Sequence, residues 1–521
     1  MRTAQAVPLI FTMRYFSLFI LLICCSQAYA QRNYQSDSVL WSIAGEQKMQ
    51  YLFGHSTLLQ DTARQNFGDL TIYYDLKNRN YRTSQQAQKT AVAAFEARGV
   101  NYLSDKIIIS GTFSYAKIWE DSLAYFLGGL DDNRIPGYFY TPKAGKFERQ
   151  TYDAQAHLGY KINSPWQADL QANYTHHWST RSVDPRMELY SMKFLLKPSL
   201  SYVSPNQQHF SLSGIWGYGR GQTDISYKNR KLNDGTALPE YHHFTSFGYG
   251  YTKELDSTAL RQYDQYRGLE LAGTWNQPSW TLYWSTSYLK RNNENTNDVR
   301  HRQHYQIKQT FNLDQIDLDL LFTDKRINNN LLRFNLKTAN GHDGVYHRGK
   351  NYFLNQWNMA LLYSKAFASG SSSRKEAGIS VQGAYDKRDD ALTEHLAVRR
   401  WIDVTVPLSW SKIGKSADRF RVQLSPSYKF ALTNRLEVPD SQINAFTKGI
   451  AYPEFYYYDV DVFAIQTKLS YLTARIVKKS KMAFFVDFRF ESAASSKQIV
   501  VGSQAFRGQN TNWRMGVNFY L

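Results

Sequence analysis

Hydrophobic and polar positions alternate along most of the chain. The last nine residues show the pattern clearly: Trp513, Met515, Val517, Phe519 and Leu521 alternate with Arg514, Gly516, Asn518 and Tyr520. A period of two places successive side chains on opposite faces of a β-strand. The C-terminal segment is therefore predicted to be a strand with one apolar face and one polar face.

The same alternation recurs in segments that are long for strands. They run to roughly 10 to 16 residues, whereas strands of soluble proteins usually have about five or six. A strand that crosses a bilayer at a tilt needs about 9–11 residues. Only a closed barrel pairs every backbone group of such strands in hydrocarbon. The pattern predicts an all-β fold, a transmembrane antiparallel up-and-down β-barrel. A secreted sandwich or propeller is the alternative, and its strands would be shorter.

The predicted barrel has about 18 strands, within a range of roughly 16 to 20, because sequence determines element boundaries weakly. The predicted strands are 69–77, 89–98, 106–118, 152–162, 166–178, 188–203, 208–220, 266–276, 279–290, 303–325, 331–338, 353–367, 376–386, 400–411, 418–431, 459–473, 480–490 and 511–521. Within 303–325 the apolar positions change from odd to even numbers, and we attribute this change to a β-bulge near Asp314.

The predicted connections alternate between short and long. Three tight connections contain proline, at 163–165, 204–207 and 277–278, whereas 119–151 and 221–265 are long. The connections 339–352, 387–399, 432–458 and 491–510 fall on the same side as the long ones. Transmembrane barrels have short periplasmic turns and long external loops. An even number of strands then places both termini in the periplasm.

The N-terminus has the pattern of a secretory signal peptide, residues 1–30. Arg14 precedes an apolar stretch over 16–23, and Ala28 and Ala30 supply the small residues of a cleavage site before Gln31. A lipoprotein anchored at Cys24 or Cys25 is the alternative, although neither cysteine follows a small residue. Both cysteines of the chain lie in this signal, so the mature protein holds no disulfide. Residues 31–68 are predicted to form a periplasmic or lumen-inserted segment, and 69–521 the barrel.

Composition excludes two other classes of protein. The mean hydropathy is −0.52, and no apolar run after residue 30 has the length of about 18 residues that a membrane-spanning helix requires. Aromatic residues make up 15% of the chain, 38 of them tyrosines, whereas disordered chains contain few aromatics. The chain is thus neither a helical membrane protein nor a disordered one.

Residues 514–521 resemble the C-terminal insertion signal of outer-membrane β-barrel proteins of Gram-negative bacteria. The positions that carry the resemblance are Arg514, Gly516, Phe519 and Leu521, with Leu521 where an aromatic residue is more usual. The resemblance implies recognition by the barrel assembly machinery and an integral position in the outer membrane. The whole chain is also similar to an uncharacterised family of exported barrels of roughly 500 residues. That family implies the architecture and no activity.

The formal net charge of the chain is +18, which suits a surface that faces acidic lipopolysaccharide. Nucleic acid is a poor partner, because the basic residues are scattered along strands. Five basic residues fall on the predicted lumen side: Lys193, Lys197, Arg421, Lys429 and Arg489. They would bias an open lumen toward anions, unless lumen acids such as Asp487 balance them.

Signatures of catalysis and of metal binding are scarce. Neither G-x-S-x-G nor H-E-x-x-H occurs. Histidines occur in pairs, at 176–177, 242–243, 301 with 304, and 342 with 347, but adjacent strand residues face opposite ways and cannot easily share an ion. We therefore expect no enzyme, metal or cofactor.

Several aromatic residues lie at predicted strand ends. Trp178, Trp410, Trp513 and Tyr456–Tyr458 are expected to form the aromatic girdles that mark bilayer interfaces. Carbohydrate stacking by the three tyrosines is the alternative.

Two functions remain open. One is a porin-like channel for small solutes; the other is a surface-binding or structural barrel, an adhesin or a component of an export assembly that acts through its long loops. A hydrolase whose triad is assembled from distant residues ranks third. Residues 31–68 are too few for the plug domain of an energised receptor, yet long enough to enter a lumen.

Overall fold

A computed structural model describes residues 41–61, 66–129, 135–233, 238–297, 305–325, 330–345, 347–369, 373–414, 418–477, 480–493 and 508–521. Its main sheet has 19 elements. Two of them, β17 (His395–Thr405) and β18 (Leu408–Ile413), are halves of one strand, because both pair with β16 on one side and with β19 on the other. Pro407 lies at the break and has no N–H to donate to a ladder. The barrel therefore has 18 strands, as predicted.

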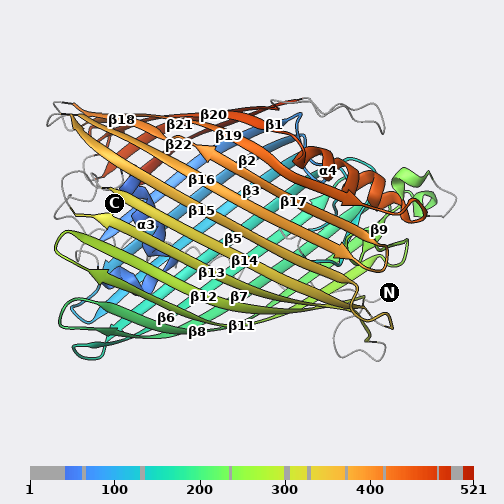
Figure 1. Cartoon of the computed structure of the whole chain (residues 1–521), viewed down its shortest axis with the longest axis horizontal. Helices are drawn as coiled ribbons and strands as arrows, with labels where there is room; N and C mark the ends of the chain where they lie inside the picture. The colour runs from blue at the N-terminus through green and yellow to red at the C-terminus, as the bar shows by residue number, and fades with distance from the viewer. Residues whose placement is uncertain are drawn as a thin grey trace, which may run out of the picture.

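The strands run antiparallel to their neighbours, and the sheet closes on itself (Figure 1). Closure joins β1 to β22, from Asp69 opposite Tyr520 to Arg79 opposite Asn510. The other bounds are β1 (Phe67–Arg79), β2 (Lys89–Tyr102), β3 (Ile107–Leu123), β5 (Gly145–Lys161), β6 (Trp166–Arg181), β7 (Arg186–Val203), β8 (His209–Ser226), β11 (Ala259–Asn276), β12 (Trp280–Thr296), β13 (Ile307–Asp324), β14 (Leu331–Val345), β15 (Tyr352–Ser369), β16 (Ser373–Asp390), β19 (Arg419–Glu437), β20 (Val462–Thr473), β21 (Lys481–Ala493) and β22 (Gln509–Tyr520).

The two ends of the barrel differ. At the turn end lie the short connections such as 162–165 and 277–279, together with Leu521. Helix α3 (Ile43–Gly54) and the 3-10 helix η2 (Ser56–Asp61) lie inside this end (Figure 1). At the loop end lie the long connections 124–144, 227–258 and 438–461. They contain a small sheet of β4 (Tyr138–Tyr140), β9 (Phe244–Ser246) and β10 (Thr252–Glu254), the 3-10 helices η3 (Arg230–Asn233), η4 (Pro239–Tyr241) and η5 (Asp440–Gln442), the π-helix η6 (Thr447–Ala451) and helix α4 (Tyr452–Tyr458).

The outward faces of the strands are apolar and exposed. Leu269, Trp216 and Ile72 keep between 51% and 59% of their surface accessible, and many other large apolar side chains share this position. A soluble monomer rarely exposes a contiguous apolar surface of this extent. In β22 the apolar set Trp513, Met515 and Leu521 is exposed in this way, so the apolar face of the last strand points outward.

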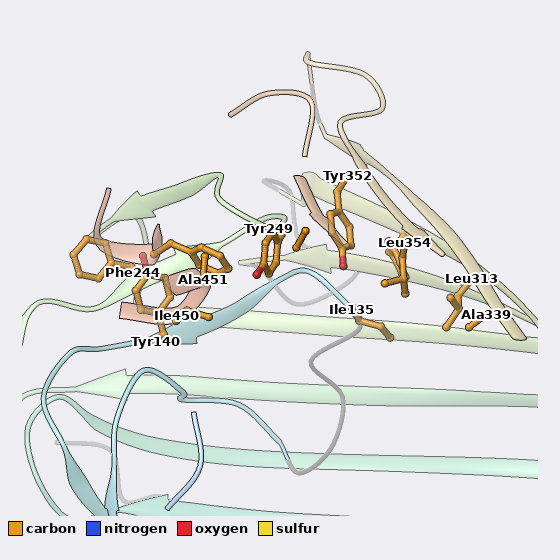
Figure 2. Packing of buried hydrophobic residues seen from close by; sticks show 13 residues of the cluster. Ile135, Tyr140, Phe244, Tyr249, Leu313, Ala339, Tyr352, Leu354, Ile450 and Ala451 are labelled. Atoms are coloured by element: carbon orange, nitrogen blue, oxygen red, sulfur yellow. The ribbon is translucent and has the colours of Figure 1, made fainter. Parts of the chain in front are cut away.

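Each of the 18 predicted strands overlaps one observed strand, but the predicted bulge near Asp314 is wrong. The β13 ladder runs without a shift from Gln309 to Thr323 against β14. The change of apolar phase has another cause: Phe311 and Leu313 face inward and are fully buried in a cluster of wall and loop residues. Figure 2 shows Leu313 in this cluster. Ile316, further along β13, faces outward and is exposed.

Several strands extend further toward the loop end than predicted. Because β14 ends at Val345 and β16 at Asp390, the predicted loops 339–352 and 387–399 shrink to 346–351 and 391–394. In these extensions the outward positions, such as Asn340, His342 and Lys387, are polar, so the apolar alternation ends before the backbone pairing does. At the other end, β1 begins at Phe67, so residues 67–68 belong to the barrel.

Candidate functional site in the barrel lumen

Segment 41–61 enters the lumen at the turn end and is fixed there by side chains of the wall. Ser42 caps α3, since its hydroxyl accepts from the Gly45 N–H at 2.9 Å. The Ile43 N–H donates to the Glu376 carboxylate at 2.9 Å, and Arg421 donates to the Glu46 carboxylate at 2.6 Å. One acidic and one basic side chain of the wall thus hold the first turn of the helix.

Arg333 holds the middle of α3. Its guanidinium forms a two-point ion pair with Asp319, at 2.7 and 3.1 Å, and also donates to the amide oxygens of Gln47 at 2.8 Å and Gln50 at 3.1 Å. A bidentate carboxylate fixes the plane of the guanidinium. The wall therefore presents a rigid donor to the helix.

His55, just after α3, lies in a series of hydrogen bonds that joins the segment to three strands, β7, β11 and β12. Its Nε2 is 3.1 Å from the Ser285 hydroxyl and its Nδ1 is 3.5 Å from Glu270. Lys197 donates to the same Glu270 oxygen at 2.6 Å. The order of residues resembles a hydrolase triad, but Ser285 is buried and its backbone takes part in both neighbouring ladders. These hydrogen bonds thus anchor segment 41–61 to the wall.

Apolar side chains of the segment complete the closure. Leu52, Leu58, Leu59 and Tyr51 are all at most 1% exposed. They pack against lumen-facing wall residues, among them Ala272, Tyr283, Leu321 and Leu331. Full burial of a leucine contributes about 1.5–3 kcal/mol, so this packing holds the segment at least as strongly as its polar contacts do.

Side chains at mid-height of the lumen remain exposed. Glu96, Asp153, Lys337, Asn358 and Gln382 face inward by the alternation of their strands, yet each is exposed. Because neither the segment nor the loops cover them, solvent reaches the wall between the two closures. The middle of the lumen is a polar compartment with charges of both signs.

The loops close the other end of the lumen. Tyr140, Phe244, Tyr249, Phe446 and Ile450 come from three different loops and are buried together with the wall residues of β13 and β15 (Figure 2). The loops also bond to one another and to the wall: Asn444 donates to the Gly250 carbonyl at 3.0 Å, and His395 lies 2.7 Å from the Thr447 hydroxyl.

A buried charge cluster fixes α4 to the wall. Arg399 of β17 donates to the Glu454 carboxylate and to the Tyr249 hydroxyl, each at 2.6 Å. Asp386 lies 3.5 Å from Arg399 and 3.2 Å from Arg388. The Arg399 and Glu454 side chains are only 2% and 4% exposed, so each charge depends on the other for compensation.

Burial shifts the pKa values of the loop residues around this closure. Desolvation raises the pKa of the Tyr138 hydroxyl to about 12 and raises that of Tyr249 as well. Desolvation lowers the pKa of His243, which is thereby kept neutral. The loop closure thus contains tyrosines that remain protonated over the physiological pH range.

Replacing Arg399 by methionine should release the loop closure. The change leaves the Glu454 carboxylate buried without its partner, and breaking a buried pair in this way costs about 3–5 kcal/mol. We expect trypsin to cut after the exposed Lys448 at least about tenfold faster than in the wild-type protein, because cleavage follows the population of the open loop. In the control R435M, which breaks the exposed Arg435–Glu437 pair, the rate should not change. An unchanged rate in R399M would contradict the role of the cluster.

The five predicted lumen basic residues all lie on inward-facing strand positions, and each has a partner. Lys197 pairs with Glu270, Arg421 with Glu46, and Arg489 with Glu491 at 2.7 Å. Lys429 lies over the rings of Tyr81, Tyr457 and Tyr458, and Lys193 lies 5.9 Å from the Tyr266 ring centroid. The acid named with them, Asp487, accepts from Gln466. These pairs favour the balanced lumen over a strongly anion-attracting one.

The residues of the predicted insertion signal occupy the closing strand. Arg514 faces the lumen and donates to Asp75 at 2.9 Å. Gly516 packs so closely on β1 that a Cβ would collide with the Ile72 carbonyl. Phe519 lies opposite Leu70 and Met482, and the Leu521 N–H donates to the Gly68 carbonyl at 2.8 Å. All four residues thus also serve the closure of the barrel.

One predicted histidine pair is separated by the structure, and one aromatic prediction is wrong. His176 and His177 face opposite sides of β6, and His301 and His304 lie outside the described residues. In the part of the chain that is described, no three metal-ligating side chains gather. Trp410 and Trp513 are exposed on the outward face, but Tyr456–Tyr458 belong to α4 in the barrel mouth, where Tyr457 stacks on Tyr81. These tyrosines are part of the loop closure, because 438–461 folds back onto the wall.

Sequence reasoning missed the residues that hold the closures. Neither His55 nor Glu454 stands in a recognisable motif, and their partners Glu270 and Arg399 are far away in the chain. The alternation of polar and apolar positions places the wall partners on the lumen side of their strands. It does not show which residues they contact.

Comparisons with known proteins give a family and a set of distant structures. A family model described as a family of unknown function (DUF6850) matches residues 56–521. No curated protein matches the chain. Among the helices described, none has the length and apolar character needed to cross a membrane.

Three solved structures illustrate the structural similarity. The outer membrane transporter YddB from Escherichia coli is 8% identical, with 87% of this chain and 81% of that chain covered and a TM-score of 0.39. The copper transporter OprC is 9% identical, with coverages of 87% and 80% and a TM-score of 0.39. The ferric citrate transporter FecA is 9% identical, with coverages of 88% and 79% and a TM-score of 0.40.

Proposed function

The chain belongs to DUF6850, a family of unknown function. From the geometry of its lumen we propose that the protein is an integral outer-membrane barrel that passes small polar solutes through this lumen. Segment 41–61 is the gate at the turn end. The observation that carries this proposal is a polar, solvent-reached lumen closed by two separate parts of the chain, neither of which belongs to the barrel wall.

The membrane position is supported by the outward faces. The exposed apolar side chains of the strands match the lipid-facing band of outer-membrane barrels, and exposed Trp410 and Trp513 match an aromatic girdle. With short turns at the periplasmic side, both termini lie in the periplasm and the loop end faces lipopolysaccharide. The last strand is then the part that the barrel assembly machinery recognises.

The gate is supported by the kind of contacts that hold the segment. Arg421, Arg333 and Glu270 of the wall contact the segment through hydrogen bonds and ion pairs. Water can replace these polar contacts with a small net change in free energy, so the apolar packing of Leu52, Leu58 and Leu59 sets most of the cost of opening. A barrel that served only as a scaffold would need no inserted segment, because wall residues can fill a lumen themselves.

The solute class follows from the compartment between the closures. Exposed Glu96, Asp153 and Lys337 carry both signs of charge, and Asn358 and Gln382 offer amides. Polar solutes without large net charge suit such a wall. Since three of the five predicted basic residues are ion-paired, we expect at most weak anion selectivity in the open state, reduced further by salt.

A reversible tether between the segment and the wall tests the gate. In E46C/R421C the Arg421–Glu46 pair is replaced by two thiols in a mature chain that should hold no other cysteine. Moderate urea weakens apolar and hydrogen-bonded contacts, so planar bilayers containing the untethered variant should show stepwise conductance in urea. A bis-maleimide that spans the two thiols should keep the same molecules closed.

Single-cysteine variants treated with the same reagent serve as controls and should open like the untethered protein. If the tethered protein opens as readily as these controls, segment 41–61 is not the gate. If no variant conducts in any state, the channel reading fails, and the ordered loops at the barrel mouth favour the surface-binding function instead.

A further inference from the structure

The outer face of β8, β11 and β12 carries a basic patch at the upper border of the apolar band. Arg220, Arg267 and Lys290 point outward and are exposed, and none of them has an ion-pair partner among the described residues. Arg267 lies opposite Trp216 on one side and opposite Lys290 on the other. Charged side chains rarely stand unpaired on a lipid-facing surface.

Aromatic side chains frame this patch. Trp216 and Tyr218 are 56% and 45% exposed, and the Arg220 guanidinium lies 6.0 Å from the centroid of the Tyr263 ring. A cleft of about 580 Å³ runs along residues 216–220, residues 263–267 and Met192. The cleft therefore joins the two arginines with aromatic walls between them.

Three acids stand nearby, and all are engaged elsewhere. Asp264 borders the cleft but faces the lumen, where it accepts from Arg291 at 2.8 Å. Asp314 lies opposite Lys290 and accepts from the Tyr288 hydroxyl at 2.6 Å. Glu294 lies opposite Tyr263 and accepts from the Tyr305 hydroxyl at 3.1 Å. Lys290 is thus partly compensated by Asp314, whereas Arg220 and Arg267 have no acid opposite them.

Below the patch the same strands offer an apolar surface. Leu212, Leu269 and Leu271 are 53%, 59% and 46% exposed. Gly214 stands between Leu212 and Trp216 on the outward face, and a Cβ placed there would meet open space. The surface thus has a notch for an acyl chain directly beneath two unpaired arginines.

From this arrangement we propose that Arg220 and Arg267 form a binding site for a phosphorylated, multiply acylated glycolipid of the surrounding leaflet. Arg267 lies opposite Trp216, which precedes Arg220 on β8 by four residues. The backbones of the two arginines are therefore about 13 Å apart along the strand direction. They bind phosphate oxygens in the fork geometry that arginine favours. The leucines and the notch at Gly214 hold the acyl chains, and Trp216 and Tyr218 contact the sugar. The inference rests on the proposed outer-membrane location.

Native mass spectrometry of the delipidated, folded barrel in detergent micelles tests the site. The probes are lipid A with two phosphates, the same lipid A without phosphates, and phosphatidylglycerol. We expect wild-type protein to retain bisphosphorylated lipid A at least about tenfold more strongly than the variant R220Q/R267Q, since each lost arginine removes a charge-assisted bond. Both proteins should bind dephosphorylated lipid A weakly and equally.

The matched control is R400Q, because Arg400 is also exposed on the outer face and also lies over an aromatic ring, that of Tyr385 at 5.2 Å. Its binding should equal that of the wild type. The site would be overturned if R400Q lost as much lipid A binding as R220Q/R267Q, or if wild type and R220Q/R267Q bound lipid A equally. It would also be overturned if the wild type bound phosphatidylglycerol as strongly as bisphosphorylated lipid A. Heat-dependent electrophoretic mobility confirms folding of each variant. Membrane fractionation separates the two proposals: wild-type protein missing from the outer membrane would overturn the location itself.

Discussion

Deletion of residues 31–61, with the signal kept, should turn a closed barrel into one that conducts ions. The deletion removes α3 and η2 from the lumen but leaves β1, which begins at Phe67, and its pairing with β22. In planar bilayers we expect the mean current to rise at least about tenfold over the full-length protein, because pore diameter and lining then set conduction. Single-channel recordings in asymmetric salt also give the selectivity.

The loop closure limits the current that the deletion can produce. Since 227–258 and 438–461 still cover the loop end, combining the deletion with R399M should raise the current further than either change alone. K48Q is a control, because Lys48 belongs to α3 and its ammonium lies 5.5 Å from the Tyr283 ring centroid. Its current should match that of the full-length protein. If the deletion combined with R399M conducts no more than R399M alone, the segment does not occlude the lumen.

Removal of Phe519–Tyr520–Leu521 should abolish the barrel. These residues pair with β1 through Leu70, Asp69 and the Gly68 carbonyl, and they complete the predicted insertion signal. Loss of the closing pairs would leave backbone groups without partners in hydrocarbon, at a cost of several kcal/mol for each group. We expect the truncated protein to be absent from the outer membrane and degraded, as seen by fractionation and by the loss of heat-modifiable mobility.

A point variant tests the outward orientation of Phe519 while leaving the length of the closing strand unchanged. F519K places a charge on the outward face, where it costs about 2–4 kcal/mol near the midplane and less toward the interface. N518K adds the same charge one residue away on the lumen face and should insert normally. Equal insertion of F519K and N518K would contradict the outward orientation of Phe519.

The two closures are attached to the barrel wall in different ways. The segment at the turn end precedes β1 in the chain, and its links to the wall are side-chain contacts such as those of Glu46, Gln47 and His55. The loops at the other end are each attached at both ends, and their closure depends on Arg399 and Glu454.

The sequence by itself determined the strands and their inward and outward faces. Alternation is a local property, because residues i and i+2 of a strand share one environment, and lipid imposes it on every strand that it contacts. The fold class, the strand number and the outward apolar face of 513–521 could all be predicted for that reason. Loop ends were misplaced because pairing continues above the lipid, where alternation is no longer required.

Only the tertiary structure decided what fills the lumen. Phe311 and Leu313 face inward with an apolar phase that the sequence alone suggested was a bulge. They are apolar because they belong to a buried cluster that wall residues form with residues of the loops. Arg421 meets Glu46 across 375 positions of sequence, and Arg399 meets Glu454 across a loop. Such contacts depend on which segments enter the barrel, and no periodicity along a strand encodes that, since an inward-facing charge has the same local pattern whether it meets water or a partner.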